Sequence, residues 1–184
     1  MSGEAHEWIS VKDEKTGLRI DFPHEPLNMT FDVPFQNTPP KGVVRLYSVP
    51  TQSGLLVLSI FQSSIKAKEL LKKEQFMNFF SKILVPHFFY YPHVFQEQQI
   101  FEYQNMKIKE LSGGIFQISY LDHEVEKKIE GCCAVDGGIF YIYFYLSSAD
   151  DFDIEILKRF VNSIEFPESS EKNLEFNQPK EIDN

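Results

Sequence analysis

Residues 113–166 read GGIFQISYLDHEVEKKIEGCCAVDGGIFYIYFYLSSADDFDIEILKRFVNSIEF and decide the fold. Their apolar runs predict three consecutive strands, at Ile115–Leu121, Val125–Val135 and Ile139–Leu146. The last run is apolar on both faces, so we expect it at the centre of a sheet. Asp122–Glu124 is expected to be a hairpin tip, and Asp136–Gly138 a tight turn, because glycine readily adopts a positive φ.

Two amphipathic helices are expected. One covers Asp150–Ser163, with Ser148 as its N-cap and Asp151 as the acid of a capping box. The other covers Lys66–Leu84, where apolar residues recur at helical spacing, and we expect Pro86 to end it.

The rest of the chain predicts further strands. We expect strands around Trp8–Val11, Leu18–Phe22, Met29–Phe31, Val43–Val49 and Leu55–Phe61. Ile100–Leu111 is expected to hold one or two more strands, with a possible turn at Gln104–Asn105. The predicted fold class is α+β, with a central, mostly antiparallel β-sheet and at least two amphipathic helices that cover one face or flank both. Residues 1–166 are expected to form a single domain, and residues 167–184 an acidic, disordered tail.

Composition excludes several classes of partner. The 184-residue chain has a formal net charge of −9, and nucleic-acid binding needs clustered Lys and Arg, so we expect no nucleic acid. The most hydrophobic window, Phe76–Phe95, contains prolines, histidines and a lysine, so no membrane span is expected. Met1–Lys15 has no apolar core typical of a signal peptide, and the expected location is therefore cytoplasmic.

The two cysteines, Cys132 and Cys133, are adjacent, so on a strand they would point to opposite faces of the sheet. They form neither a disulfide framework nor a CxxC pair. We interpret them as small buried hydrophobic residues.

The segment His87–His93 is the most unusual in composition, with two histidines that flank four aromatic residues. It could line a pocket or bind a metal, but a histidine pair with no third ligand of matching spacing is weak evidence for zinc, and an aromatic plug under a loop is the favoured interpretation. The candidate binding surface consists of His87, Phe88, Phe89, Tyr90, Tyr91 and His93. The proline-rich loop at residues 34–40 is the other place where a site is expected.

Recognisable catalytic motifs are absent from the sequence. The glycine pairs Gly113–Gly114 and Gly137–Gly138 lack the spacing of phosphate-binding loops, and neither a GxSxG nor an HExxH motif occurs. His123 lies between two carboxylates and could act as a general base, but in a turn between strands an exposed hairpin tip is the favoured interpretation. We therefore assign no catalytic, cofactor-binding or metal-binding residue and expect no cofactor, and the sequence does not favour an enzyme.

Two segments resemble PsbP-like domains. Residues 17–23, GLRIDFP, are similar to the early strand of that fold, which ends in a Phe-Pro sequence. Residues 138–143, GIFYIY, and 160–166, FVNSIEF, resemble its closing strand and its ending after the last helix, although Ile164 stands where an aromatic residue is usual. The fold includes a photosystem subunit and a Ran-binding nuclear import factor, so the resemblance implies an α+β domain but no single function.

Three functions are compatible with these observations. The first is a non-enzymatic binding or adaptor module of PsbP-like type with a protein partner. The second is an acidic protein that resembles secretion chaperones and binds an extended partner segment. The third is an enzyme or ligand carrier with a pocket near residues 87–93.

Overall fold

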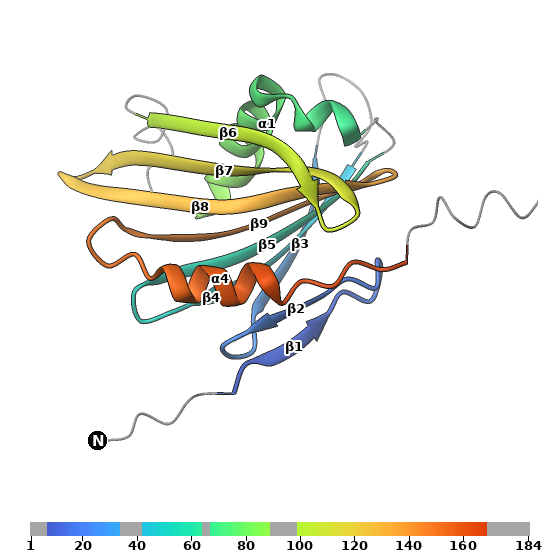
Figure 1. Cartoon of the computed structure of the whole chain (residues 1–184), viewed down its shortest axis with the longest axis horizontal. Coiled ribbons are helices and arrows are strands. Elements are labelled where there is room, and N and C mark those ends of the chain that lie inside the picture. The colour runs from blue at the N-terminus through green and yellow to red at the C-terminus, as the bar shows by residue number, and fades with distance from the viewer. Residues whose placement is uncertain (1–6, 34–41, 64–66, 89–98, 169–184) are drawn as a thin grey trace, which may run out of the picture.

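The computed structural model describes residues 7–33, 42–63, 67–88 and 99–168, which form two antiparallel sheets and several helical segments (Figure 1). The strands are β1 (Ile9–Lys12), β2 (Arg19–Phe22), β3 (Leu27–Val33), β4 (Gly42–Pro50), β5 (Gly54–Ser63), β6 (Gln99–Ile108), β7 (Leu111–Asp122), β8 (Val125–Asp136) and β9 (Ile139–Ser148). The helical segments are η1 (Ala67–Leu71), α1 (Lys73–Phe79), η2 (Phe80–Leu84), α2 (Val85–Phe88) and α4 (Ile154–Asn162).

The main sheet has seven strands in the order β3-β4-β5-β9-β8-β7-β6, and every pair of neighbours is antiparallel. β9 is the middle strand, as its two apolar faces predict. Alternate residues of β9 are buried in two separate clusters: Phe140, Ile142 and Phe144 on one face, and Tyr141, Tyr143 and Tyr145 on the other. The α+β class with an antiparallel sheet is thus confirmed.

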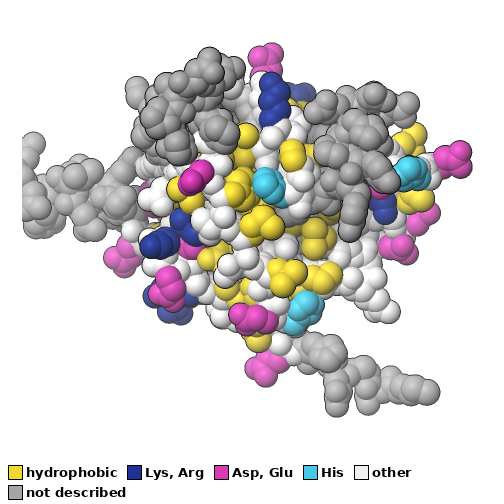
Figure 2. Space-filling model, turned by 180° about the vertical axis from the view of Figure 1, so that it is seen from behind, with side chains coloured by type: hydrophobic (Ala, Val, Ile, Leu, Met, Phe, Trp, Pro, Cys, Tyr) yellow, Lys and Arg dark blue, Asp and Glu magenta, His cyan; other side chains and the backbone are white. Residues whose placement is uncertain are grey.

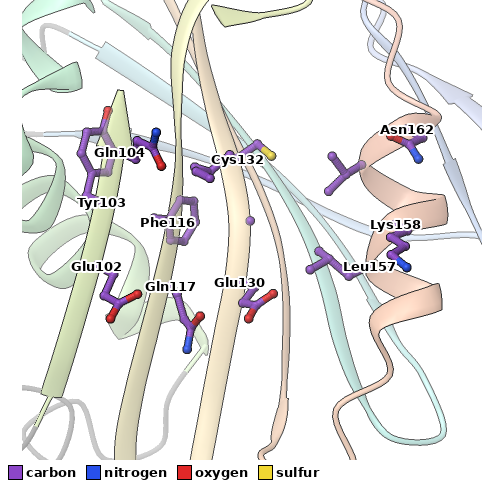
Figure 3. Close-up of a pocket in the computed structure, with 13 residues that line it drawn as sticks. Glu102, Tyr103, Gln104, Phe116, Gln117, Glu130, Cys132, Leu157, Lys158 and Asn162 are labelled. Atoms are coloured by element: carbon purple, nitrogen blue, oxygen red, sulfur yellow. The ribbon is translucent and has the colours of Figure 1, made fainter. Parts of the chain in front are cut away.

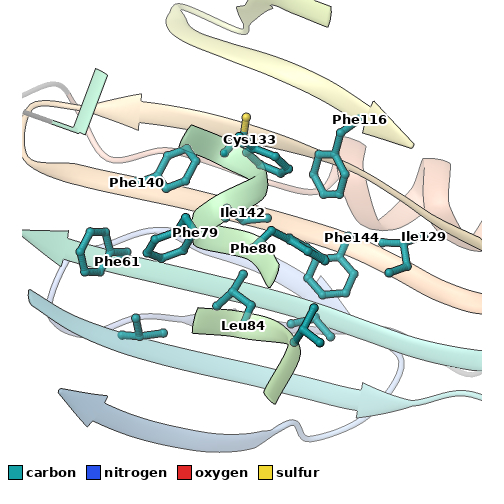
Figure 4. Close-up of a cluster of buried hydrophobic side chains, with 14 of the residues drawn as sticks. Phe61, Phe79, Phe80, Leu84, Phe116, Ile129, Cys133, Phe140, Ile142 and Phe144 are labelled. Carbon is teal, nitrogen blue, oxygen red and sulfur yellow. The ribbon is translucent and has the colours of Figure 1, made fainter. Parts of the chain in front are cut away.

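The first face of the sheet is covered by η1, α1, η2 and α2, and we call it the α1 face (Figures 1 and 4). Phe76 is fully buried there, with its ring 4.7 Å from that of Phe116 and 5.2 Å from that of Tyr103. Seven of the 18 phenylalanines are buried in this core, and Phe31 and Phe101 pack against it. Its ring pairs include edge-to-face contacts, such as that of Phe76 with Phe140, and stacked contacts, such as that of Phe76 with Phe80.

The helix predicted at Lys66–Leu84 is not continuous. It consists of a 3-10 helix (η1), a short α-helix (α1) and a π-helical turn (η2). The helical segment then continues past Pro86 as α2. The prediction that Pro86 ends it is therefore wrong. Pro86 lies in the first turn of α2, where proline is best tolerated, and the preceding turn is wider because the Val85 N–H bonds to the Phe80 carbonyl.

The opposite face of the sheet is covered by α4 and by the small sheet β1–β2, and we call it the α4 face. Phe22 of β2 and Phe160 of α4 are both fully buried, with ring centroids 5.2 Å apart. The predicted cap of this helix is wrong. Asp153 is the N-cap, because its Oδ1 accepts hydrogen bonds from the backbone N–H groups of Glu155 and Ile156. Ser148 and Asp151 bond to each other before the helix begins.

β6 is one uninterrupted strand, so the predicted turn at Gln104–Asn105 is wrong. The turn lies at Lys109–Glu110, where Lys109 has a φ of +54°. Lysine is unusual at positive φ, and its Nζ donates a hydrogen bond to the Ile164 carbonyl, which fastens the turn to the residues that follow α4. The expected hairpin tip between β7 and β8 is present, with positive φ at both His123 and Glu124.

The two cysteines lie as predicted, Cys133 in the core of the α1 face and Cys132 in that of the α4 face, and both are free thiols. Among the described helices, none combines the length and apolar character needed to cross a membrane. The loop at residues 34–40 and most of the tail at 167–184 lie outside the described residues, so the expectations for them stay predictions.

Candidate binding groove

A groove with a volume of about 530 Å³ lies on the α4 face, between α4 and strands β6, β7 and β8 (Figure 3). Its sheet wall consists of Glu102, Tyr103, Gln104, Ile115, Phe116, Gln117, Glu130, Gly131 and Cys132. Its helix wall consists of Leu157, Lys158, Val161 and Asn162. We call it the α4 groove.

The α4 groove exists because α4 is too short and too far from one edge of the sheet to cover it. The helix packs against β2, β8 and β9, while β6 and β7 continue beyond it (Figure 1). Several side chains of β6 and β7 on this face are therefore open to solvent. Met106 is 44% exposed and Ile115 39% exposed, although both are hydrophobic.

Strand register arranges the side chains of the sheet wall that lie on the α4 face in two rows. Gln104, Ile115 and Cys132 are aligned across β6, β7 and β8. Ile115 and Cys132 give this row an apolar floor, which continues to Leu157 and Val161 on α4 (Figure 3). The neighbouring row aligns Glu102, Gln117 and Glu130, and it is polar and acidic.

The charges around the groove are unevenly paired. Glu130 forms an ion pair with Lys128 of the same strand at 2.5 Å, and Lys158 pairs with Glu155 along α4 at 2.8 Å. Glu102 is exposed on β6, and no described residue forms an ion pair with it. The arrangement can therefore hold an apolar side chain on the floor and a cationic side chain beside Glu102.

The Cys132 thiol in the groove wall is not an activated nucleophile. Burial raises its pKa to about 11, although the neighbouring Tyr143 hydroxyl opposes part of that rise. A thiol attacks as the thiolate, and a raised pKa leaves almost none of it at neutral pH. Cys132 thus contributes to the apolar floor of the groove, and not to a reaction.

Of the candidate surface predicted at residues 87–93, the structure describes the side chain of His87 alone. Its ring stacks on Phe31 of β3 with centroids 3.9 Å apart, and burial lowers its pKa. Phe88 is the last residue of α2, and Phe89, Tyr90, Tyr91 and His93 lie outside the described residues. In the part of the chain that is described, no group of three or more His, Cys, Asp or Glu could hold a metal ion. Whether these six residues form a surface stays a prediction.

A second apolar surface lies at the other edge of the main sheet. Leu27 of β3 is 73% exposed and Met29 is 49% exposed, and they share the face of Phe31, which packs on the α1-face core. Figure 2 shows hydrophobic side chains gathered across the side of the molecule opposite to that of Figure 1. This surface is separate from the α4 groove, which lies on the other face of the sheet.

No residue of the α4 groove was predicted as a site from the sequence, because the groove is assembled from four elements. The only pattern in the sequence that points to the groove is the mixture of apolar and polar residues along one face of β7. Exposed apolar residues such as Ile115 share a strand face with polar ones such as Gln117, and a strand face of this kind is only partly covered.

No family model matches the chain, and no curated protein matches it. The solved structures that are similar to the chain include the following two. One is PA94 from Pseudomonas aeruginosa, a protein of unknown function and putative regulator, at 7% identity and a TM-score of 0.34 over 78% of this chain and 85% of that chain. The other is LpqN of Mycobacterium tuberculosis, involved in cell envelope biogenesis, at 12% identity and a TM-score of 0.38 over 88% of this chain and 91% of that chain. Likeness at this level says nothing about function.

Proposed function

We propose that this protein is a non-enzymatic binding or adaptor module that holds a segment of a protein partner in the α4 groove. The observation that carries the proposal is the composition of the groove: an apolar floor at Ile115, Leu157 and Val161 beside an acidic row at Glu102 and Glu130. Protein interfaces combine a buried apolar centre with a polar rim in this way.

The openness of the groove supports a macromolecular partner over a small ligand. A small-molecule site buries most of its ligand, whereas here Ile115 on the floor is 39% exposed and Glu102 at the rim is exposed. The net charge of −9 and the carboxylates of the groove favour a partner segment with basic residues and disfavour nucleic acid.

The proposal includes a PsbP-like fold and a cytoplasmic location. The order of β9 and α4, followed by Ile164 and Phe166 packed on the α4-face core, supports the first. Two free, buried cysteines are compatible with a reducing compartment, which supports the second.

Site-specific photo-crosslinking in the native host tests the proposal. The changes Gln104→p-benzoylphenylalanine and Gln117→p-benzoylphenylalanine place a reactive group in the groove, and Glu74→p-benzoylphenylalanine places it on α1, on the other face of the sheet. We expect the same protein to be crosslinked from both groove positions and not from position 74. Crosslinking to no protein, or equally from all three positions, would contradict the proposal, as would turnover of a defined small substrate by the purified chain.

A substitution that introduces a charge on the groove floor tests whether the partner binds there. Ile115→Arg places a cation on the apolar floor, and because Ile115 is already 39% exposed the fold is expected to tolerate it. We expect this variant to lose crosslinking from position 117 while its thermal unfolding midpoint stays close to that of the unsubstituted chain.

A further inference from the structure

β6 is an edge strand of unusual regularity. It pairs with β7 over its whole length, from Gln99 opposite Tyr120 to Ile108 opposite Leu111, without a bulge and without a proline. No described strand pairs with its other side, where the seven-stranded sheet ends. Natural proteins interrupt such edges with bulges, prolines or short strands, because a regular edge pairs readily with another chain.

The turn at Lys109–Glu110 determines which backbone groups of β6 face outward. Ile108 and Leu111 close a two-residue hairpin, and such a closing pair exchanges both of its backbone hydrogen bonds. Hydrogen-bonded and non-hydrogen-bonded pairs alternate from there along the strand. The even-numbered residues therefore direct their N–H and C=O groups toward β7. The odd-numbered residues direct theirs to the open edge: Phe101, Tyr103, Asn105 and Lys107.

The side chains beside this edge form two different rows. On the α4 face, Glu102, Gln104 and Met106 follow one another along β6, and the first two line the α4 groove. On the α1 face, Phe101 and Tyr103 pack against the buried ring of Phe76, at centroid distances of 5.8 Å and 5.2 Å.

We propose that the outer edge of β6 accepts an extended segment of a partner protein as an additional strand, with a Lys or Arg of that segment beside Glu102. The inference deepens the proposed function and rests on it, because it states how the partner of the α4 groove is held. Main-chain hydrogen bonds to the odd-numbered residues supply affinity, and alternate side chains of the added strand supply specificity.

The exposed carboxylate of Glu102 favours a partner segment with a basic residue beside it. Glu102 is exposed, with no ion-pair partner among the described residues, and Glu130 lies two strands away in the same row. Directly opposed like charges on neighbouring strands destabilise a sheet, and opposite charges stabilise it. A strand with a basic residue at this position, in a protein of net charge −9, is therefore favoured over an acidic one.

Fluorescence anisotropy with two labelled synthetic peptides tests the inference on the full-length chain. Both peptides alternate Val and Thr, and they differ in a single central residue, Lys in one and Glu in the other. We expect the Lys peptide to bind, and the Glu peptide to bind more weakly. Amide hydrogen exchange is expected to slow at Phe101, Tyr103, Asn105 and Lys107 when the Lys peptide is present.

Asn105→Pro is the decisive variant. Proline at position 105 removes an outward N–H and places its ring at the open edge, and it breaks no bond to β7. We expect about tenfold weaker binding of the Lys peptide, and no such loss for the matched control Asn105→Ala. Equal binding to the wild-type chain and to Asn105→Pro, or no binding of either peptide at millimolar concentration, would overturn the inference.

The outcomes separate this inference from the proposed function. If Asn105→Pro leaves crosslinking from positions 104 and 117 intact, the partner binds in the groove without an added strand, so the inference fails and the proposed function stands. If the chain alone sediments as a dimer that Asn105→Pro converts to a monomer, a second copy of the chain occupies the edge, and the inference of a different partner is overturned.

Discussion

The Asp13 carboxylate accepts two hydrogen bonds from the Arg45 guanidinium, one from Nε at 2.9 Å and one from Nη2 at 3.0 Å. It also accepts a bond from the Tyr47 hydroxyl at 2.7 Å, and two from Thr16, through its backbone N–H and its hydroxyl, at 2.8 Å and 2.7 Å. Asp13 follows β1, and Arg45 and Tyr47 belong to β4. A single buried carboxylate thus fastens the small sheet to the seven-stranded sheet.

Removing the charge of Asp13 is expected to destabilise the fold substantially. Asp13→Asn leaves the Arg45 guanidinium, whose side chain is 11% exposed, without its counter-ion, and breaking a buried pair of this kind costs about 3 kcal/mol. Urea unfolding measures the loss of unfolding free energy. Glu14→Gln is the control, because it removes an exposed carboxylate from the same turn, and it is expected to change the unfolding free energy by less than about 0.5 kcal/mol. A loss equally small for Asp13→Asn would show that the pair contributes little.

The same carboxylate is expected to make stability depend on pH in the acid range. Burial alone would raise the pKa of Asp13, but hydrogen bonds from Arg45, Thr16 and Tyr47 outweigh it and hold the pKa at about 2, below its usual 3.8. Because the folded-state pKa is lowered, the contribution is fully present above about pH 4 and is lost as the pH falls toward 2. The shift corresponds to about 2 kcal/mol.

Unfolding free energies measured in urea at several pH values between 2 and 6 test this expectation. The profile of Asp13→Asn is expected to be flatter than that of the unsubstituted chain over the acid range, since it lacks the titrating group. If both profiles fall in parallel, other carboxylates account for the acid dependence.

The N-terminus of α4 offers a test between two capping residues. Asp153→Ala removes the side chain that accepts bonds from Glu155 and Ile156, and losing an N-cap costs about 1 kcal/mol. Asp151→Ala is the matched control, because Asp151 bonds to Ser148 outside the helix. We expect thermal unfolding to be lowered by the first change and nearly unaltered by the second. The reverse result would restore the capping box that the sequence alone suggests.

The hydrophobic pattern of single strands was sufficient to place the centre of the sheet. Ile139–Leu146 is apolar on both faces, and only a strand with a layer on each side can bury both, so its central position follows from the residues themselves. The broken helix from Ala67 to Phe88 could not be predicted in the same way. Its apolar spacing is helical throughout, and the π-helical turn at Phe80–Leu84 becomes visible only in the backbone hydrogen bonds.

The α4 groove could not be predicted from the sequence for a related reason. It depends on the distance between α4 and the edge of the sheet, and α4 lies away from that edge, where it packs with β2 through Phe160 and Phe22. By contrast, the candidate surface at residues 87–93 was predicted from its histidine and aromatic composition alone. Of its residues, only His87 has a described side chain, and its stacking on Phe31 is a packing contact.

The two adjacent thiols are expected to be unreactive in the folded chain. Burial raises the pKa of Cys132 to about 11 and that of Cys133 to about 12, so almost no thiolate is present at pH 8. Titration with 5,5′-dithiobis(2-nitrobenzoate) should give negligible reaction in buffer and two thiols in denaturant. Cys132→Ala and Cys133→Ala, each reduced to one thiol in denaturant, identify which residue reacts in any partial labelling. Rapid reaction of Cys132 at pH 8 would show that α4 moves away from the sheet, because Cys132 is only 7% exposed while α4 is packed beside it.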